Sequence, residues 1–395
     1  MLSRQDIDAL AHRLRPHYRR FLDGLDDDVL LTGHSHQAWP DVSRDAHLRA
    51  WDDAATQIDG KWGKILSELL PSFQRGIARR IGSSRPDDIA LAPNTHELVY
   101  RLLSCLPHPP KVLTTSSEFH SLNRQLDRLI EDGAQVTRVD AESPTFANQM
   151  IDALDAGAYD LVALSMVLFT TSRVIGGIDE LLRAAERRGV PVLLDAYHAF
   201  NAIPMNADAH VGQVFVTGGG YKYAQSGEGV CWMSLPADAA EFRPRTTGWF
   251  ADFASLESGA SQVQYGAGGY RFFGATFDPA GLYRGEAVMR WMDEVGLDVP
   301  TLRRQSLLQS GLLIEQFDEL GLKERGLTLA TPREASQRGA FVSIRTPEAA
   351  DVSRRLGEAG VRMDTRQDLL RFGPAPYTTS AEIVEGMSRL AQIVG

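Results

Sequence analysis

Apolar residues recur along this chain with two different periods, which predict alternating helices and strands. Between residues 111 and 217, short β-branched runs alternate with segments of helical spacing. Strands separated by helices of this length are typical of β–α–β units, which build a mostly parallel sheet. The sequence therefore predicts an α/β fold. The expected strands are 111–114, 135–139, 161–167, 190–194 and 213–217, and the expected helices between them are 121–131, 146–156 and 178–188.

The two ends of the chain follow other patterns. Helical spacing predicts one helix from residue 1 to about residue 30 and further helices within 41–83. After residue 280, two helical segments lead into short strands, including 361–364 and 369–372, which predict a small α+β unit. We therefore expect an N-terminal helix and loop at 1–40, a large α/β domain at 41–285, and a small C-terminal α+β domain at 286–395.

Composition argues against several classes of function. The 395 residues carry a formal net charge of -10 without a Lys/Arg-rich tract, so no nucleic-acid partner is expected. Two cysteines in so long a chain favour a reducing compartment, and the polar N-terminus and lack of a long apolar run predict a cytoplasmic protein without membrane spans. No dinucleotide fingerprint, Walker motif or cluster of metal-ligand spacing occurs, so no metal site is expected.

Two polar residues at the ends of neighbouring predicted strands suggest a cofactor. Asp195 closes the run 190–194, and Lys222 follows the run 213–217 and a triple glycine. A lysine at a strand exit can be partly desolvated, which lowers its pKa and frees a neutral amine for Schiff-base chemistry. An aspartate that keeps a pyridine nitrogen protonated and a lysine amine are the groups that pyridoxal 5'-phosphate (PLP) needs. The alternative is a solvated lysine and a helix-capping aspartate.

Other predicted sheet exits carry residues that suit the same cofactor. Asn94 or Thr95 is a good N-cap for the helix that starts there, and a helix N-terminus offers N–H groups to a phosphate. Phe119 could stack on a pyridine ring or fill the core. Arg371 closes a strand before a stiff Gly-Pro-Ala-Pro segment, so it could grip a carboxylate through two N–H bonds or form a surface ion pair. The loop 33–40, with two histidines, a serine and a tryptophan, could line a site or cap the next helix.

These motifs resemble those of kynureninase, within the class V aminotransferase group of fold-type-I PLP enzymes. The resemblance rests on Asp195-x-x-His198, Tyr221-Lys222-Tyr223 and Arg371-Phe372-Gly373, and it extends from about residue 29 to the C-terminus. It implies a seven-stranded-type sheet, a homodimer with shared active sites, and catalytic roles for Lys222, Tyr221 and Asp195. The cofactor-binding residues that it implies are Asn94, Thr95, Phe119, Ser121, Asp195, His198, Tyr221, Lys222, Trp249 and Thr276. The substrate-binding residues that it implies are Arg371, His34 and Ser35.

The chain also departs from the family pattern near the expected substrate. Kynureninases usually continue the tryptophan loop as Gly-Trp-Trp-Gly-His, whereas this chain has Phe250-Ala251-Asp252 after Trp249. The resemblance implies hydrolytic Cβ–Cγ cleavage of a kynurenine-type amino acid that releases alanine, in amino-acid metabolism. A class V aminotransferase or another PLP lyase with a different amino acid is the alternative. A PLP-fold binding protein that has lost catalysis is the alternative from another class. A cysteine desulfurase is disfavoured because Cys231 lies in a strand-like run and Cys105 in apolar surroundings rather than in mobile loops.

Overall fold

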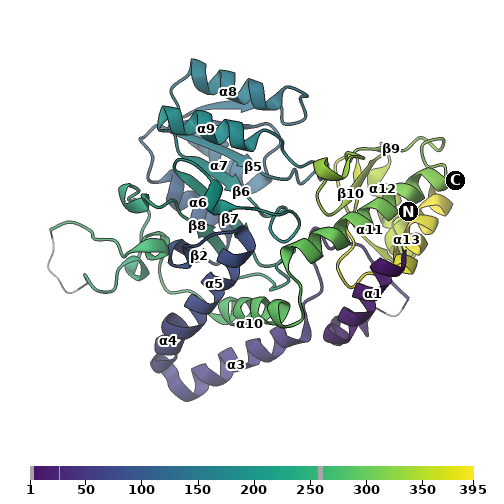
Figure 1. Ribbon diagram of the computed structural model, residues 1–395, viewed down its shortest axis with the longest axis horizontal. Helices are drawn as coiled ribbons and strands as arrows, with labels where there is room; N and C mark the ends of the chain where they lie inside the picture. Colours follow the sequence, from purple (N-terminus) through teal and green to yellow (C-terminus); the bar gives the residue numbers. More distant parts are fainter. Residues whose placement is uncertain (1–3, 26, 257–260) are drawn as a thin grey trace.

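A seven-stranded sheet forms the centre of the larger part of the molecule (Figure 1). The computed structural model describes residues 4–25, 27–256 and 261–395. From β7 to β4 the neighbouring strands pair in parallel, and β8 is antiparallel to both of its neighbours. The mostly parallel sheet predicted from the alternating pattern is therefore confirmed. In spatial order the strands are β2 (Ile89–Ala92), β8 (Cys231–Ser234), β7 (Val214–Gly219), β6 (Val192–Asp195), β5 (Leu161–Ser165), β3 (Lys111–Thr115) and β4 (Gln135–Val139).

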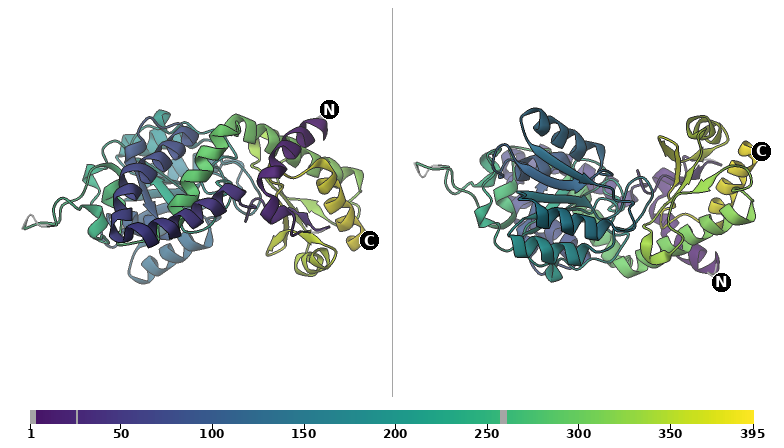
Figure 2. Two further views of the ribbon diagram at one scale, coloured as in Figure 1. Left: turned by 90° about the horizontal axis from the view of Figure 1, so that it is seen from below. Right: turned by 90° about the horizontal axis from the view of Figure 1, so that it is seen from above.

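Helices lie on both faces of this sheet (Figure 2). The central strands β5 and β7 are buried along their whole length, as parallel strands covered on both faces require. Among the residues that the structure describes, no helix combines the length and the apolar character needed to cross a bilayer. The helices around the sheet are α3 (Asp41–Gln57), α4 (Lys61–Lys64), α5 (Leu70–Ile81), α6 (Thr95–Leu103), α7 (His120–Glu131), α8 (Phe146–Ala156), α9 (Ile178–Arg188) and α10 (Ala280–Glu294).

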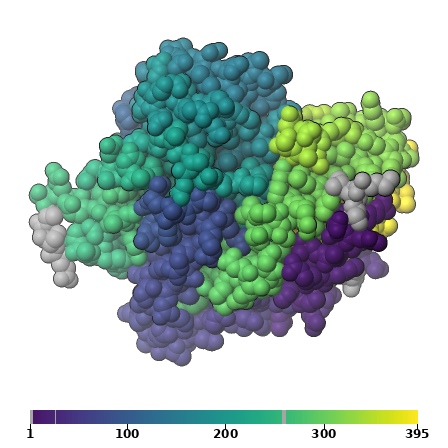
Figure 3. Space-filling view, viewed as in Figure 1, coloured from purple at the N-terminus to yellow at the C-terminus, as the bar shows by residue number. Residues whose placement is uncertain are grey.

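A second, smaller sheet and its helices lie beside the large sheet, with both chain ends (Figure 1). The space-filling view shows the N-terminal segment lying against C-terminal residues (Figure 3). Ile7 and Val29 belong to the same buried cluster as side chains of the C-terminal helices. The strands of this part are β12 (Asp364–Arg366), β13 (Leu369–Phe372), β10 (Val342–Arg345) and β9 (Thr328–Leu329) in one sheet and β1 (Val29–Leu30) beside β11 (Val361–Arg362) in another; its helices are α11 (Val299–Glu319), α12 (Ala349–Glu358) and α13 (Ser380–Val394).

The N-terminal helix is shorter than the sequence predicts. The chain forms α1 (Arg4–Leu14), a 3-10 turn (Arg15–His17) and α2 (Arg19–Leu22) instead of one helix to about residue 30. Pro16 lies in that turn, and a proline ends a helix because it has no N–H and its ring clashes with the preceding turn. Residues 1–3 and 26 of the predicted helix lie outside the described residues. The strand predicted over 361–364 is likewise divided, because its two ends pair in different sheets as β11 and β12.

Helix α10 crosses the domain boundary that the sequence predicts between residues 285 and 286. Its side chains Val288, Met289 and Met292, beyond that boundary, pack in the buried cluster of the large sheet. The next helix, α11, contributes Leu312 and Phe317 to the cluster of the small sheet. We therefore propose that the large unit extends to the turn between α10 and α11, near residues 295–298.

Candidate active site

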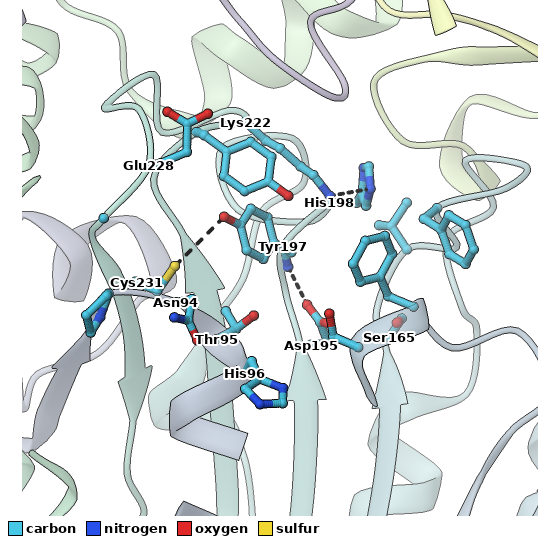
Figure 4. A pocket seen from close by; sticks show the side chains of 17 residues that line it. Asn94, Thr95, His96, Ser165, Asp195, Tyr197, His198, Lys222, Glu228 and Cys231 are labelled. Atoms are coloured by element: carbon cyan, nitrogen blue, oxygen red, sulfur yellow. Dashed lines mark hydrogen bonds between the residues drawn. The ribbon is translucent and has the colours of Figure 1, made fainter. Parts of the chain in front are cut away.

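A cavity of about 190 Å³ opens at the carboxyl ends of the parallel strands (Figure 4). It lies where ligands bind in open α/β sheets, since loops from several strands converge there. Eight of the residues predicted to bind a cofactor line this cavity. They are Asn94, Thr95, Phe119, Ser121, Asp195, His198, Tyr221 and Lys222.

Lys222 extends into this cavity from the loop after β7. Its side chain is buried, and its Nζ lies 2.8 Å from Nε2 of His198. The ring centroid of Tyr197 lies 4.5 Å from Nζ, and those of Phe119 and Tyr221 lie within 6 Å as well. Burial lowers the pKa of Lys222 to about 7, although Asp195 opposes the shift. A substantial fraction of the amine is therefore neutral near neutral pH, and a neutral amine can attack a carbonyl.

Asp195 is the last residue of β6, and His198 lies in the turn that follows it. Oδ1 of Asp195 accepts a hydrogen bond from the backbone N–H of Tyr197 at 2.8 Å. Burial raises the pKa of Asp195, while that hydrogen bond and the charge of Lys222 oppose the shift. Nδ1 of His198 is buried and has no hydrogen-bond partner among the described residues. A cavity wall with an unpartnered ring nitrogen and a carboxylate is suited to a polar, cationic ligand edge.

The N-terminus of α6 forms another wall of the cavity. Asn94 is its N-cap, and its side-chain oxygen accepts from the N–H of Glu97 at 2.9 Å, as the capping interpretation predicted. Near the cap, the backbone groups of Thr95 and Gly220 lower the pKa of the Cys231 thiol, but burial has the larger effect. Burial raises the pKa of that thiol to about 11, so the sulfur is uncharged. This wall therefore presents backbone donors and a positive helix end without an acid group of its own.

A buried carboxyl group lies behind the cavity wall. Glu118, next to the predicted stacking residue Phe119, accepts hydrogen bonds from the backbone and the hydroxyl of Ser165 and from the hydroxyl of Thr115, at 2.6–3.0 Å. Burial raises the pKa of Glu118 to about 7, against these hydrogen bonds. Asp195 contributes to the same rise through its charge.

Replacing Glu118 by Gln should flatten the pH dependence of stability of the cofactor-free protein. The folded-state pKa of Glu118 lies above its ordinary value of 4.5, so its stabilising effect is present below pH 4.5 and is lost as the pH rises toward about 7. A shift of this size corresponds to about 3 kcal/mol. The difference in urea unfolding free energy between Glu118→Gln and wild type should therefore move in favour of the variant between pH 5 and pH 8. The exposed control Glu142→Gln should show no such movement, and parallel pH profiles for Glu118→Gln and wild type would contradict the prediction.

Two residues predicted to bind the cofactor lie outside this cavity. Nε1 of Trp249 donates to the hydroxyl of Thr276 at 3.2 Å, and the two residues line other surface hollows. Phe250, at one of the departures from the family pattern, is buried against Trp62 and Phe277 and does not face the cavity.

The residues predicted to bind substrate are also absent from the cavity lining. Arg371 is almost fully buried and holds the carboxylate of Asp364 through Nε and Nη2. His34 is fully buried and lies 2.8 Å from the same carboxylate. The Ser35 hydroxyl donates to the carbonyl oxygen of Thr32 within its own turn. Arg371 is therefore not the surface ion pair considered as its alternative, but a buried one beside the cavity.

Two residues that line the cavity, Tyr197 and Glu228, were not among the predicted site residues. Tyr197 lines the cavity, and in the view of Figure 4 its side chain lies between those of Lys222 and Asp195. Tyr197 belongs to the segment 195–198, which the sequence placed at the end of a strand. The direction of its side chain depends on the conformation of the turn, which the sequence does not show. Glu228 also lines the cavity, and one of its carboxylate oxygens lies 3.6 Å from Nε2 of His36. In the part of the chain that the structure describes, no group of three or more His, Cys, Asp or Glu residues could hold a metal ion.

Comparison with known proteins assigns the chain to a family. A family model described as the kynureninase C-terminal domain matches residues 302–390. Kynureninase of Pseudomonas fluorescens is 28% identical over 431 aligned positions that cover 100% of this chain and 96% of the relative. Kynureninase of Salinispora tropica is 30% identical over 390 positions that cover 88% of this chain and 86% of the relative. The chain belongs to the kynureninase family. The predicted resemblance to kynureninase-like, fold-type-I PLP-dependent enzymes is thereby confirmed.

Solved structures share the fold at lower sequence identity. The cystine C–S lyase C-DES, in complex with its reaction product cysteine persulfide, has a TM-score of 0.81 at 19% identity, with 93% of this chain and 98% of that chain covered. The apo cysteine desulfurase of Thermococcus onnurineus NA1 has a TM-score of 0.79 at 17% identity, with 97% of this chain and 98% of that chain covered. The predicted fold class is therefore confirmed.

Proposed function

We propose that this protein is a PLP-dependent hydrolase that cleaves the Cβ–Cγ bond of a kynurenine-type amino acid and releases alanine. The observation that carries the proposal is the buried amine of Lys222, which shares one cavity with Asp195 and the N-terminus of α6. Membership of the kynureninase family supports the hydrolytic reaction over other PLP chemistry.

The residues of the cavity fit this cofactor. The unpartnered Nδ1 of His198 and the carboxylate of Asp195 offer polar contacts to a pyridine ring, and Phe119 offers an aromatic face. Thr95, Ser121 and the start of α6 offer hydroxyl and N–H donors to a phosphate. When bound, pyridoxal phosphate supplies an electron sink that stabilises negative charge at the α-carbon of an amino acid.

The roles of the protein's own groups follow from their chemistry. Lys222 would hold the cofactor until the substrate amine replaces it, and its freed amine would then carry the α-proton, for which a pKa of about 7 is well suited. Tyr221, whose pKa burial raises, keeps its hydroxyl proton and would donate it to the developing product. Water adds across the cleaved bond: the acyl fragment gains its hydroxyl and leaves as a carboxylic acid, and the β-carbon gains a proton and leaves as alanine.

Cysteine desulfurase chemistry has little support in this chain, although the fold is shared. That reaction needs a reactive cysteine as nucleophile, but burial raises the thiol pKa of both Cys105 and Cys231, to about 12 and about 11.

An absorbance spectrum with a product assay tests the proposed function. The purified protein should be yellow, its spectrum should change when L-kynurenine or 3-hydroxykynurenine is added, and alanine should form in equal amount to the acid product. A yellow protein that turns over neither compound would contradict the kynurenine-type substrate and favour another amino acid. A colourless protein that cannot be loaded with PLP would favour a binding protein that has lost catalysis.

We further propose that the protein works as a homodimer in which Trp249 and Thr276 complete the neighbouring active site. These two residues are hydrogen-bonded to each other, and both lie outside the cavity of their own chain. Large apolar side chains are exposed near Trp249 and on α3: Trp249 (48%), Phe253 (37%), Val263 (58%) and Trp51 (76%). Exposed apolar groups of this kind mark interaction surfaces in soluble proteins. A light-scattering mass equal to that of one chain would contradict this proposal.

A further inference from the structure

Asp364 and Arg371 form a buried two-bond ion pair beside the cavity. They lie directly opposite each other on the antiparallel strands β12 and β13. Nε of Arg371 donates to Oδ1 of Asp364 at 2.8 Å, and Nη2 donates to Oδ2 at 2.5 Å. This arrangement uses one edge of the guanidinium group, the edge that carries Nε and Nη2, and fixes the plane of the group.

Two N–H groups of the guanidinium group, one on Nη1 and one on Nη2, remain available for a ligand. Nη1 donates to the carbonyl oxygen of Phe169 at 2.5 Å, and the side chain of Phe169 lines the cavity. A guanidinium group has five N–H donors, so one N–H on Nη1 and one on Nη2 have no acceptor among the described residues. Two such N–H groups on adjacent nitrogens match the two oxygens of a carboxylate.

The surroundings hold this pair in one position. The ring of Phe341 lies 5.9 Å from Cζ of Arg371 and stacks on His34 at a centroid distance of 4.6 Å. Burial lowers the pKa of His34 to about 4, so the ring is neutral at pH 7 and donates from Nε2 to Asp364. Burial opposes the ionisation of Asp364, but the hydrogen bond from His34 and the charge of Arg371 hold its pKa well below its ordinary value.

The net charge of these three groups is zero, because Asp364 and Arg371 cancel and His34 is neutral. The exposed Arg366, whose Nη2 lies 4.0 Å from Oδ2 of Asp364, adds one positive charge at the edge of the group. The remaining N–H groups of Arg371 supply the directed hydrogen bonds, so the affinity of the site for a carboxylate depends on where they point.

We propose that Asp364 is a positioning residue that turns the free end of Arg371 toward the substrate α-carboxylate. The proposal rests on the proposed function, because the carboxylate belongs to an amino acid bound near Lys222. The charge of Arg371 also acts on Lys222, which places the two groups in the same electrostatic surroundings. The role of Asp364 is specific to the carboxylate, so it does not extend to the amine or the side chain of the substrate.

The variant Asp364→Asn tests this role. An amide has an NH2 group in place of one carboxylate oxygen, so the two parallel hydrogen bonds from Nε and Nη2 cannot both form and the guanidinium group loses its fixed plane. The dissociation constant of L-kynurenine, followed by spectral titration of the PLP-loaded enzyme, should rise by about tenfold or more, as the loss of a hydrogen bond to a charged group predicts. The dissociation constant of kynuramine, the same molecule without its carboxylate, should stay unchanged. KM should rise with little change in kcat.

A matched control is available in α12. Asp351 is exposed and pairs with Arg354, so Asp351→Asn makes the same chemical change away from the site and should leave both titrations unchanged. If Asp364→Asn does not fold, Asp364→Glu keeps the charge and moves the carboxylate by one methylene group, and it should weaken L-kynurenine selectively as well.

The outcomes separate this proposal from the proposed function. Unchanged or tighter binding of L-kynurenine by the Asp364 variant would overturn the positioning role; tighter binding would mean that Asp364 competes with the substrate for Arg371. Equal weakening of kynuramine would also overturn it. If the wild type responds to neither compound, the kynurenine-type function is contradicted instead. The role of Asp364 is then tested with L-alanine and with ethylamine, which is alanine without its carboxylate, by the same comparison of dissociation constants.

Discussion

Replacing Lys222 by Ala should reduce kcat by about 10³-fold or more, because one amine holds the cofactor and moves the α-proton. The side chain is buried among aromatic rings, and no other lysine among the described residues lines the cavity. The purified variant should also lose the visible absorbance that depends on a lysine-linked cofactor. Stopped-flow turnover and an absorbance spectrum after dialysis would measure both effects.

The exposed Lys111 supplies a matched control for this variant. Lys111→Ala removes the same side chain at the start of β3, away from the cavity, and should leave turnover and the spectrum unchanged. If Lys222→Ala kept the lysine-type absorbance through dialysis, Lys222 could not be the residue that binds the cofactor.

Most of the large domain could be predicted from sequence because its signals are local. The runs that became β3 to β7 and the helices between them are each encoded within a dozen residues, and a parallel sheet brings their carboxyl ends to one edge. Asp195 and Lys222 could therefore be placed in one site from their positions at strand ends. The predicted helix over residues 1–30 was wrong in extent because the helical spacing was given more weight than Pro16.

The partners of Arg371 could not be found in the same way. Asp364 faces Arg371 because a two-residue loop, Gln367-Asp368, sets the register of the hairpin, and Gln367 has a positive φ of 53° that the sequence does not announce. His34 reaches the same carboxylate from more than 300 residues away, a contact made only by tertiary packing. The predicted roles of Trp249 and Thr276 stay predictions, because a single chain places them away from its own cavity.

Replacing Gly219 by Ala should displace side chains that line the cavity, although Gly219 has an ordinary strand backbone. A Cβ at Gly219 would overlap the hydroxyl of Tyr197 and lie 2.6 Å from the sulfur of Cys231. The ring of Tyr197 lies against the backbone of β7 at this position, and its centroid lies 4.5 Å from the amine of Lys222. The added methyl group would therefore push Tyr197 toward the amine, into space that the cofactor requires.

We expect Gly219→Ala to lower the free energy of unfolding by about 1–3 kcal/mol, the usual cost of overpacking a core. The affinity of the cofactor-free protein for PLP should fall by about 100-fold if a comparable cost falls on the cofactor site. Denaturant unfolding and PLP titration would measure these effects.

Two further variants decide whether the contact with Tyr197 is the cause. Tyr197→Ala should restore part of the loss in the Gly219→Ala background, because it removes the larger of the two overlaps, and the two changes should be non-additive. Gly357→Ala, in α12, adds the same methyl group where no described residue beyond its own helix turn comes within 4 Å, and it should stabilise the protein by about 0.5–1 kcal/mol. If the losses of stability and PLP affinity from Gly219→Ala and Tyr197→Ala were additive, the two residues would act separately. The position of Tyr197 in the cavity would then not depend on Gly219.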